Sequence, residues 1–179
     1  MKRFNILSIV VILIMILTMV MLVIAKGPVG DTITINWLED AERYNAEDLL
    51  LSSWTDDPLG PAELIKTGKA YHFADIQEYY NWPLDNLSGS LVISGAGQLS
   101  GHATYISPRS ELPIRDRFKG EVAVNPDDGT MVGTYAQWSY AFGTEDEVLG
   151  WYPGAIKDED GEEEPCWWLV GYTEYVAHE

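Results

Sequence analysis

The densest group of chemically active side chains is an acidic segment near the C-terminus, where six carboxylates surround one glycine in residues 158–164. Calcium-binding loops use oxygen ligands at fixed spacing around such a glycine. If Gly161 took the sixth position of an EF-hand loop, Ile156 and Trp167 would take the first and twelfth positions. Neither side chain can bind calcium, so the EF-hand motif is excluded.

A looser calcium site in this segment would use Asp158, Asp160 and Glu162. Clustered carboxylates without a rigid frame usually stay solvated, and loops between strands lie on the protein surface. Aromatic stretches flank the segment on both sides, which is typical of a hairpin loop. We therefore expect a solvated loop and no cofactor, with calcium at these three residues as the alternative.

Basic residues gather in residues 108–119 of this acidic chain. Pro108 and Pro113 predict an irregular loop there. Its charge comes from four side chains: Arg109, Arg115, Arg117 and Lys119. Arginine binds carboxylate or phosphate through its planar fork of donors. The segment is thus a candidate site for an anionic ligand or envelope polymer, and pairing with the protein's own carboxylates is the alternative.

The sequence contains no recognisable motif for zinc or for nucleophilic catalysis. The histidines, His72, His102 and His178, show no paired spacing, so zinc has no support. The single cysteine, Cys166, cannot close an intramolecular disulfide. Because two tryptophans follow it, we interpret Cys166 as a small buried apolar residue. No catalytic residue is predicted.

Paired carboxylates are the one catalytic option that the composition permits. A glycosidase needs two carboxyl groups about 5 Å or about 6.5–9.5 Å apart beside a sugar-binding cleft. The 7 Trp and 10 Tyr could stack on sugars, but with 28 acidic residues some pair is close in any fold. Aromatic filling of a core without disulfides explains the same composition. An enzyme acting on extracellular glycans is therefore the alternative.

The second half of the chain has the alternation typical of antiparallel strands. Strands are expected at residues 90–94, 101–107, 120–124, 130–143, 148–152 and 166–176. The clearest is 130–143, and Asp128-Gly129 before it is a hairpin signal. Residues 166–176 are apolar on both faces, so a second layer, such as an N-terminal helical segment, should cover them.

The first third of the domain is predicted to be mostly helical. Residues 31–39 alternate β-branched and polar side chains and predict a strand. Acidic residues followed by an apolar stripe then favour a helix over 39–54. A short helix is expected over 60–68, with Pro61 in its first turn, and another helical turn over 74–83.

An apolar segment occupies residues 6–25, where Ser8 and Thr18 are the polar members. As a helix it would span roughly 30 Å, the thickness of a bilayer's hydrocarbon core. The basic pair Lys2 and Arg3 favours a cytoplasmic N-terminus, so the following domain should be exported. We expect an uncleaved anchor, and the alternative is a signal peptide cleaved after Ala25.

The net charge of the chain limits the kinds of molecule that it can bind. The chain has 11 basic and 28 acidic residues, a formal net charge of −17. Without Lys2 and Arg3, residues 26–179 carry 9 basic and 28 acidic residues, or −19. Such a surface repels phosphate backbones, so no nucleic-acid partner is expected.

Together these features predict three parts: a transmembrane anchor or signal segment (1–25), a linker (26–30) and an extracytoplasmic domain (31–179). The domain should be mainly β, an antiparallel sandwich or small barrel with a short helical N-terminal part. We expect a non-enzymatic, membrane-anchored domain that binds a ligand or protein partner at the cell envelope. The alternatives are the glycan enzyme and a structural subunit of a surface assembly.

Overall fold

The computed structural model describes residues 31–80, 83–158 and 163–179. Two short helices, α2 (Ile76–Tyr80) and α3 (Glu145–Trp151), interrupt a succession of strands. The strands are β1 (Asp31–Asn45), β2 (Leu50–Thr67), β3 (Ala70–Phe73), β4 (Ser88–Ile93), β5 (Gln98–Ile106), β6 (Pro113–Asn125), β7 (Thr130–Gly143), β8 (Ile156–Lys157) and β9 (Cys166–His178).

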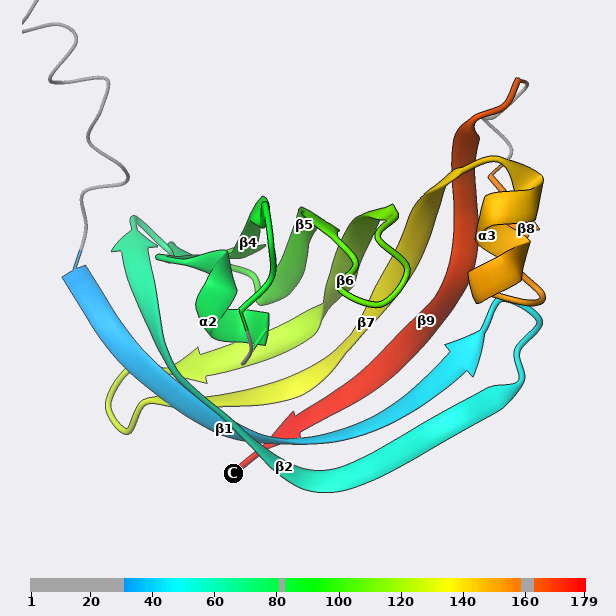
Figure 1. The fold of residues 1–179 in the computed structure, drawn as a ribbon. Coiled ribbons are helices and arrows are strands. Elements are labelled where there is room, and N and C mark those ends of the chain that lie inside the picture. Colours follow the sequence, from blue (N-terminus) through cyan, green and yellow to red (C-terminus); the bar gives the residue numbers. More distant parts are fainter. Residues whose placement is uncertain (1–30, 81–82, 159–162) are drawn as a thin grey trace, which may run out of the picture.

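Eight of these strands close into an antiparallel barrel. Each strand from β1 to β7 pairs with the next, β7 pairs with β9, and β9 returns to β1. The long strands β1 and β2 bend around one side of the ring (Figure 1). The short β8 pairs with β9 outside the ring. The mainly β prediction is confirmed, and of the two architectures expected the fold is the barrel.

The predicted transmembrane segment, residues 6–25, lies outside the described residues. Within the described ranges, no helix has the length and apolar character needed to span a bilayer.

The helices predicted over 39–54 and 60–68 are wrong, because β1 continues to Asn45 and both segments pair as strands. Long-range pairing with a bent neighbour overrides local helix propensity. The register shifts between Ile35 and Trp37, and Pro61 falls in that irregularity. Proline is tolerated there because a bulge does not require its missing N–H.

Two other predicted elements are also wrong. Residues 148–152 belong largely to α3 rather than to a strand. Three acidic residues occupy the first turn of α3, and Glu147 accepts a hydrogen bond from the Thr144 N–H, so the start of the helix is stabilised. The loop expected over 108–119 is shorter, since β6 begins at Pro113. The helical turn α2 and the strands β1, β7 and β9 are confirmed where they were expected.

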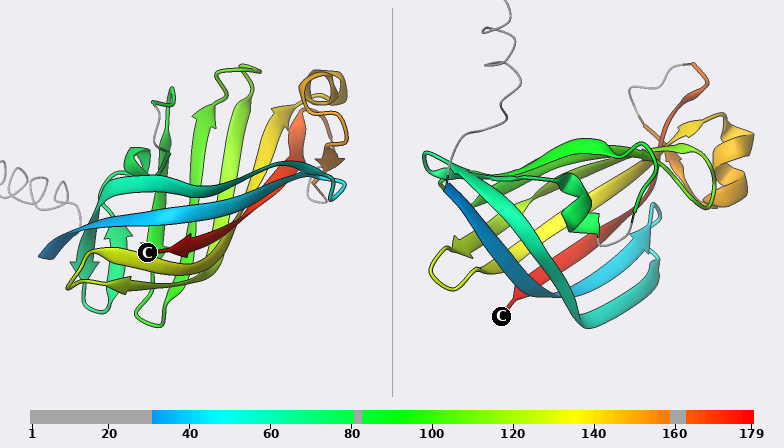
Figure 2. Two further views of the ribbon diagram at one scale, coloured as in Figure 1. Left: turned by 90° about the horizontal axis from the view of Figure 1, so that it is seen from below. Right: turned by 60° about the vertical axis from the view of Figure 1, so that its left-hand side comes forward.

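The barrel interior changes character along its axis. One end is closed by fully buried apolar side chains from five strands: Ile35, Leu64, Leu91, Ile93, Leu99 and Met131. Towards the other end lies α2, drawn within the ring of strands in Figure 2, whose Ile76 and Tyr79 join the main core. Burial of these side chains is the main stabilising contribution to the fold.

A second, smaller core lies where β7 and β9 extend beyond the ring. Val148 of α3 packs there with Cys166 and Trp168 of β9, and Cys166 is buried as expected. The second layer over the doubly apolar strand is therefore α3 and its loops, not the N-terminal segment. The tip of the β1–β2 hairpin lies beside this unit (Figure 1).

Candidate functional site

The middle of the barrel interior holds a buried carboxylate, Glu39 of β1, which is 3 % exposed. Its Oε2 accepts hydrogen bonds from the Tyr135 hydroxyl and from Trp37 Nε1. Tyr79 of α2 donates in turn to the Tyr135 hydroxyl over 3.3 Å. Burial raises the pKa of Glu39 to about 7, and the bonds from Tyr135 and Trp37 oppose that rise. Glu39 can therefore exchange a proton near neutral pH.

A second buried carboxylate, Asp116 of β6, anchors α2 and the neighbouring strands. Its Oδ2 accepts hydrogen bonds from the Tyr80 hydroxyl at 2.6 Å and from Gln137 Nε2 at 2.7 Å. Tyr175 donates to Gln137 Oε1 at 2.9 Å, so the network reaches β9. Burial raises the pKa of Asp116, while the hydroxyls of Tyr80 and its neighbours lower it. Within the described residues, Asp116 Oδ1 has no partner at hydrogen-bonding geometry.

A cavity of about 280 Å³ opens above this network, towards the polar end of the barrel. We call it the interior cavity. It is lined by a mixture of aromatic, charged and polar residues: Glu39, Arg43, Trp54, Asp57, Leu59, Tyr79, Tyr80, Tyr105, Gln137, Ser139, Thr173 and Tyr175. An eight-stranded barrel has room for its own side chains or for one small ligand.

A second cavity, of about 430 Å³, lies at the rim between the β1–β2 hairpin tip, the loop before β6 and the end of α3. We call it the rim cavity. Its described lining is Arg43, Asn45, Leu51, Ser52, Arg109, Trp151, Tyr152, Pro153 and Val170. Two arginines are in this set and no carboxylate is. Arg43 also lines the interior cavity, so its side chain stands between the two spaces.

Local hydrogen bonds hold the walls of the rim cavity. Asn45 Oδ1 accepts the backbone N–H groups of Glu47 and Leu49, which fixes the turn between β1 and β2. On the opposite wall, the Tyr152 hydroxyl lies 3.0 Å from the Ser110 hydroxyl. The turn and the loop that carries Arg109 are thereby positioned by side chains of the cavity lining.

The four predicted basic residues do not form one site. Arg109 lines the rim cavity, whereas Arg115, Arg117 and Lys119 alternate along the outward face of β6. Arg115 forms an ion pair with Asp158 at 3.4 Å and lies 4.4 Å from the Trp167 ring. The guanidinium of Arg117 lies 5.0 Å from the Tyr140 ring. These two arginines are engaged by the protein itself.

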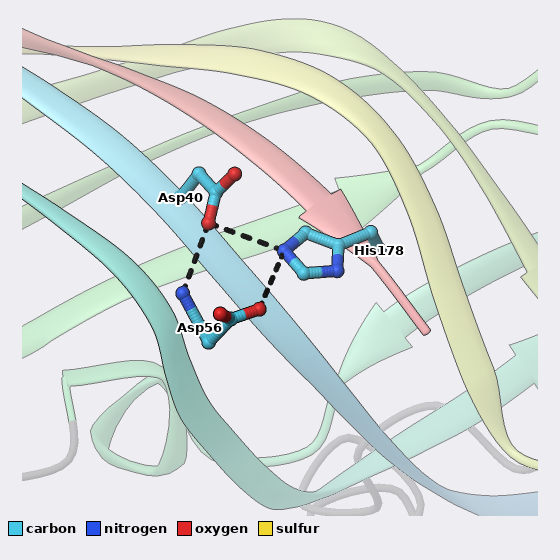
Figure 3. Close-up of side chains that lie close together, drawn as sticks. All are labelled: Asp40, Asp56 and His178. Atoms are coloured by element: carbon cyan, nitrogen blue, oxygen red, sulfur yellow. Dashed lines mark hydrogen bonds and ion pairs between the residues drawn. The ribbon is translucent and has the colours of Figure 1, made fainter.

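Of the predicted calcium ligands, Asp158 therefore pairs with Arg115, and Asp160 and Glu162 lie outside the described residues. The structure instead gathers Asp40, Asp56 and His178 on the outer wall (Figure 3). His178 Nε2 is 3.2 Å from Asp40 Oδ1 and 3.8 Å from Asp56 Oδ1. These side chains come from β1, β2 and β9, so no sequence spacing could reveal the cluster.

The sequence prediction missed Arg43 and the inward carboxylates. A signal was present in β1, where Ile35, Trp37, Glu39 and Ala41 occupy alternate positions and are all buried. Continuing that alternation places Arg43 at the mouth of the barrel. This alternation was missed because a helix, and not a strand, was predicted over residues 39–54.

Comparison with known proteins finds no family model, no curated protein and no solved structure that matches this chain. The class of the protein is therefore defined by its own fold and cavities, as an eight-stranded antiparallel barrel with a polar interior and an arginine-lined rim.

Proposed function

We propose that this domain binds a small amphipathic anion, a carboxylate or phosphate attached to an apolar ring or chain, in the rim cavity. The observation that carries the proposal is the cavity lining. In a chain with 11 basic and 28 acidic residues, a space of about 430 Å³ is lined by two arginines and no described carboxylate. Ligand cavities commonly have such a volume and a few placed polar groups.

Arg43 and Arg109 supply the positive charge of the rim cavity. In the described part of the chain, neither guanidinium forms an ion pair, although acidic side chains are abundant. An arginine that is not neutralised by its own protein retains its donors for an anion. Because the surrounding surface is acidic, binding also needs the anion to be held by direct hydrogen bonds and not by long-range attraction.

The apolar part of the ligand is assigned to the opposite wall. Leu51 is 56 % exposed and Trp151 is 49 % exposed, and both line the cavity. Val170 and Pro153 extend this apolar wall. Covering exposed apolar side chains with a ligand removes them from water, which stabilises the complex.

The apolar segment 6–25 supports a proposal about location. An anchor or signal of that length would place this cavity outside the cytoplasm, at the cell envelope. The ligand would then be an extracytoplasmic metabolite or a group on an envelope molecule.

The test is isothermal titration calorimetry of the full-length chain, purified in maltoside micelles. The chain is titrated with 2-naphthoate and, separately, with 2-naphthyl phosphate. We expect saturable binding of at least one anion and much weaker binding of uncharged 2-naphthalenemethanol. Arg109→Gln and Arg43→Gln should each raise the Kd about tenfold, since each removes a charge-assisted hydrogen bond.

Arg117→Gln is the matched control, because it removes the same charge from the outer wall. It should leave the Kd unchanged. Equal binding by the wild-type chain, Arg109→Gln and Arg43→Gln would refute the proposal, provided that melting curves show all variants folded. Loss of binding in Arg117→Gln alone would move the site to the outer face of β6.

A further inference from the structure

We propose that Asp40, Asp56 and His178 form a zinc site on the outer wall of the barrel, with the remaining coordination position open to solvent. The site is independent of both cavities. Three strands supply its ligands, and the register of the barrel brings them together: Leu38 pairs with His178, and Glu39 with Asp57. Figure 3 shows the three side chains converging on one point.

The spacing of the ligand atoms fits a small cation. One ligand atom from each residue lies within 4.8 Å of the others. Zinc binds imidazole nitrogen and carboxylate oxygen at about 2.0–2.2 Å, so in a tetrahedron two ligands are about 3.4 Å apart. The distances from His178 Nε2 to Asp40 and Asp56, 3.2 Å and 3.8 Å, bracket that value.

An irregularity in the pairing of β1 and β2 places Asp56 beside Asp40. The register of β1 and β2 shifts between Glu39 and Ala41, so that extra residues of β2 lie opposite Asp40. Asp56 sits in this bulge, and its N–H donates to Asp40 Oδ1 at 2.9 Å. The same hydrogen bond orients the Asp40 carboxylate towards the imidazole ring of His178.

A separate contact fixes the histidine ring. His178 Nδ1 lies 3.4 Å from the backbone oxygen of Glu179, which accepts a hydrogen bond in the tautomer that carries its hydrogen on Nδ1. Nε2 then faces two carboxylate oxygens. In that tautomer the lone pair of Nε2 is directed at these oxygens, which is the arrangement that a metal ion bound between them requires. Metal-binding histidines typically donate their other ring N–H to a carbonyl or carboxylate in this way.

The types of ligand atom in the cluster, one imidazole nitrogen and two carboxylate oxygens, indicate which metal ion it would bind. Calcium and magnesium prefer sites made entirely of oxygen, whereas one imidazole and two carboxylates suit zinc and related transition metals. Asp56 is largely exposed, with 74 % of its side chain accessible, so the ion must be held weakly and exchange with solution. We therefore expect a dissociation constant in the micromolar range.

The test uses the full-length chain without a histidine tag, stripped with EDTA and titrated with Zn²⁺ by calorimetry at pH 7.5. We expect one saturable site that Asp40→Asn and His178→Gln each weaken at least tenfold. Asp127→Asn and His102→Gln, which change exposed residues elsewhere, are the matched controls and should bind as the wild type does. Calcium should give no saturable site that depends on His178.

Substitution with Co²⁺ provides a second measurement, because a tetrahedral site with nitrogen and oxygen ligands gives a visible absorption band. That band should be present in the wild type and absent in His178→Gln. Unchanged zinc affinity in His178→Gln, with no cobalt band in the wild type, would show that zinc binds only diffusely to the acidic surface and would overturn the proposal.

Discussion

Glu39 and Asp40 are consecutive acidic residues on β1, yet their pKa values are shifted in opposite directions. Glu39 points into the barrel, where burial raises its pKa to about 7. Asp40 points outward, where hydrogen bonds from the Asp56 N–H and from His178 lower its pKa. Because successive side chains in a strand face opposite sides, one step along the chain separates a carboxyl group with a raised pKa from one with a lowered pKa.

The same contrast recurs on β6. Asp116 is fully buried and accepts hydrogen bonds from Tyr80 and Gln137, whereas its neighbours Arg115 and Arg117 lie on the outer face against aromatic rings. The inner face builds the hydrogen-bond network below the cavities. On the outer face, Arg115 forms an ion pair with Asp158, and both arginines lie against aromatic rings.

The largest expected effect comes from breaking the inner network at Asp116. Asp116→Ala leaves the buried donors of Tyr80 and Gln137 without their acceptor, so the free energy of unfolding should fall by about 3 kcal/mol. Glu121→Ala, on the exposed face of the same strand, should change it by less than about 0.5 kcal/mol. Urea denaturation followed by tryptophan fluorescence measures both. Equal losses would remove the distinction between the two faces of β6.

The next effect is the pH dependence caused by Glu39. Its folded-state pKa of about 7 lies above the ordinary 4.5, so the folded chain retains a proton that the unfolded chain has lost between these values. The stability from this proton is complete below pH 4.5 and declines by about 3 kcal/mol as pH rises through 7. Glu39→Gln should abolish this decline and make the chain more stable than wild type at pH 8.5. Parallel stability curves would contradict the burial of Glu39.

A smaller effect is expected on the outer face at Arg115. Arg115→Gln removes the ion pair with Asp158 and the stacking on Trp167, and should lower the free energy of unfolding by about 1 kcal/mol. Binding of 2-naphthoate should not change. If binding is lost while stability is kept, Arg115 belongs to a recognition site after all.

The smallest effect concerns Asp40 and His178 without metal. The pKa of His178 is raised, so its stabilising pair with Asp40 is complete below 6.5 and is lost as pH rises through the raised value. The pKa of Asp40 is lowered, so the pair also requires a pH above the ordinary 3.8. We therefore expect His178→Gln, measured in EDTA, to have a slightly lower melting temperature than the wild type between pH 3.8 and the raised pKa of His178. At pH 9 the two melting temperatures should be equal. A deficit that grows at high pH would contradict the assigned pair.

Strand alternation explains which parts of the fold the sequence could reveal. The strand at 130–143 was predictable because alternation and an Asp-Gly turn agree there. Which of its faces is buried was not, since Tyr135 and Gln137 point inward while the more aromatic positions Trp138 and Tyr140 point outward. Total hydrophobicity therefore favours the wrong face.

The cavities and the metal cluster depend on long-range register, which no local pattern contains. The acidic run after Glu39 resembles the first turn of a helix until β2 and β9 pair on either side of β1. Arg109 was predicted as an anion-binding residue, but its partner in the rim cavity is Arg43 of β1 and not Arg115 or Arg117 of β6.

Binding of the anion in the rim cavity is tested most directly by NMR of the arginine side-chain Nε–H groups in the full-length chain. We expect added 2-naphthoate to shift the Arg43 and Arg109 signals in a saturable way and to leave those of Arg115 and Arg117 in place. Shifts confined to Arg115 and Arg117, or no saturable shift at any of the four, would contradict the assignment.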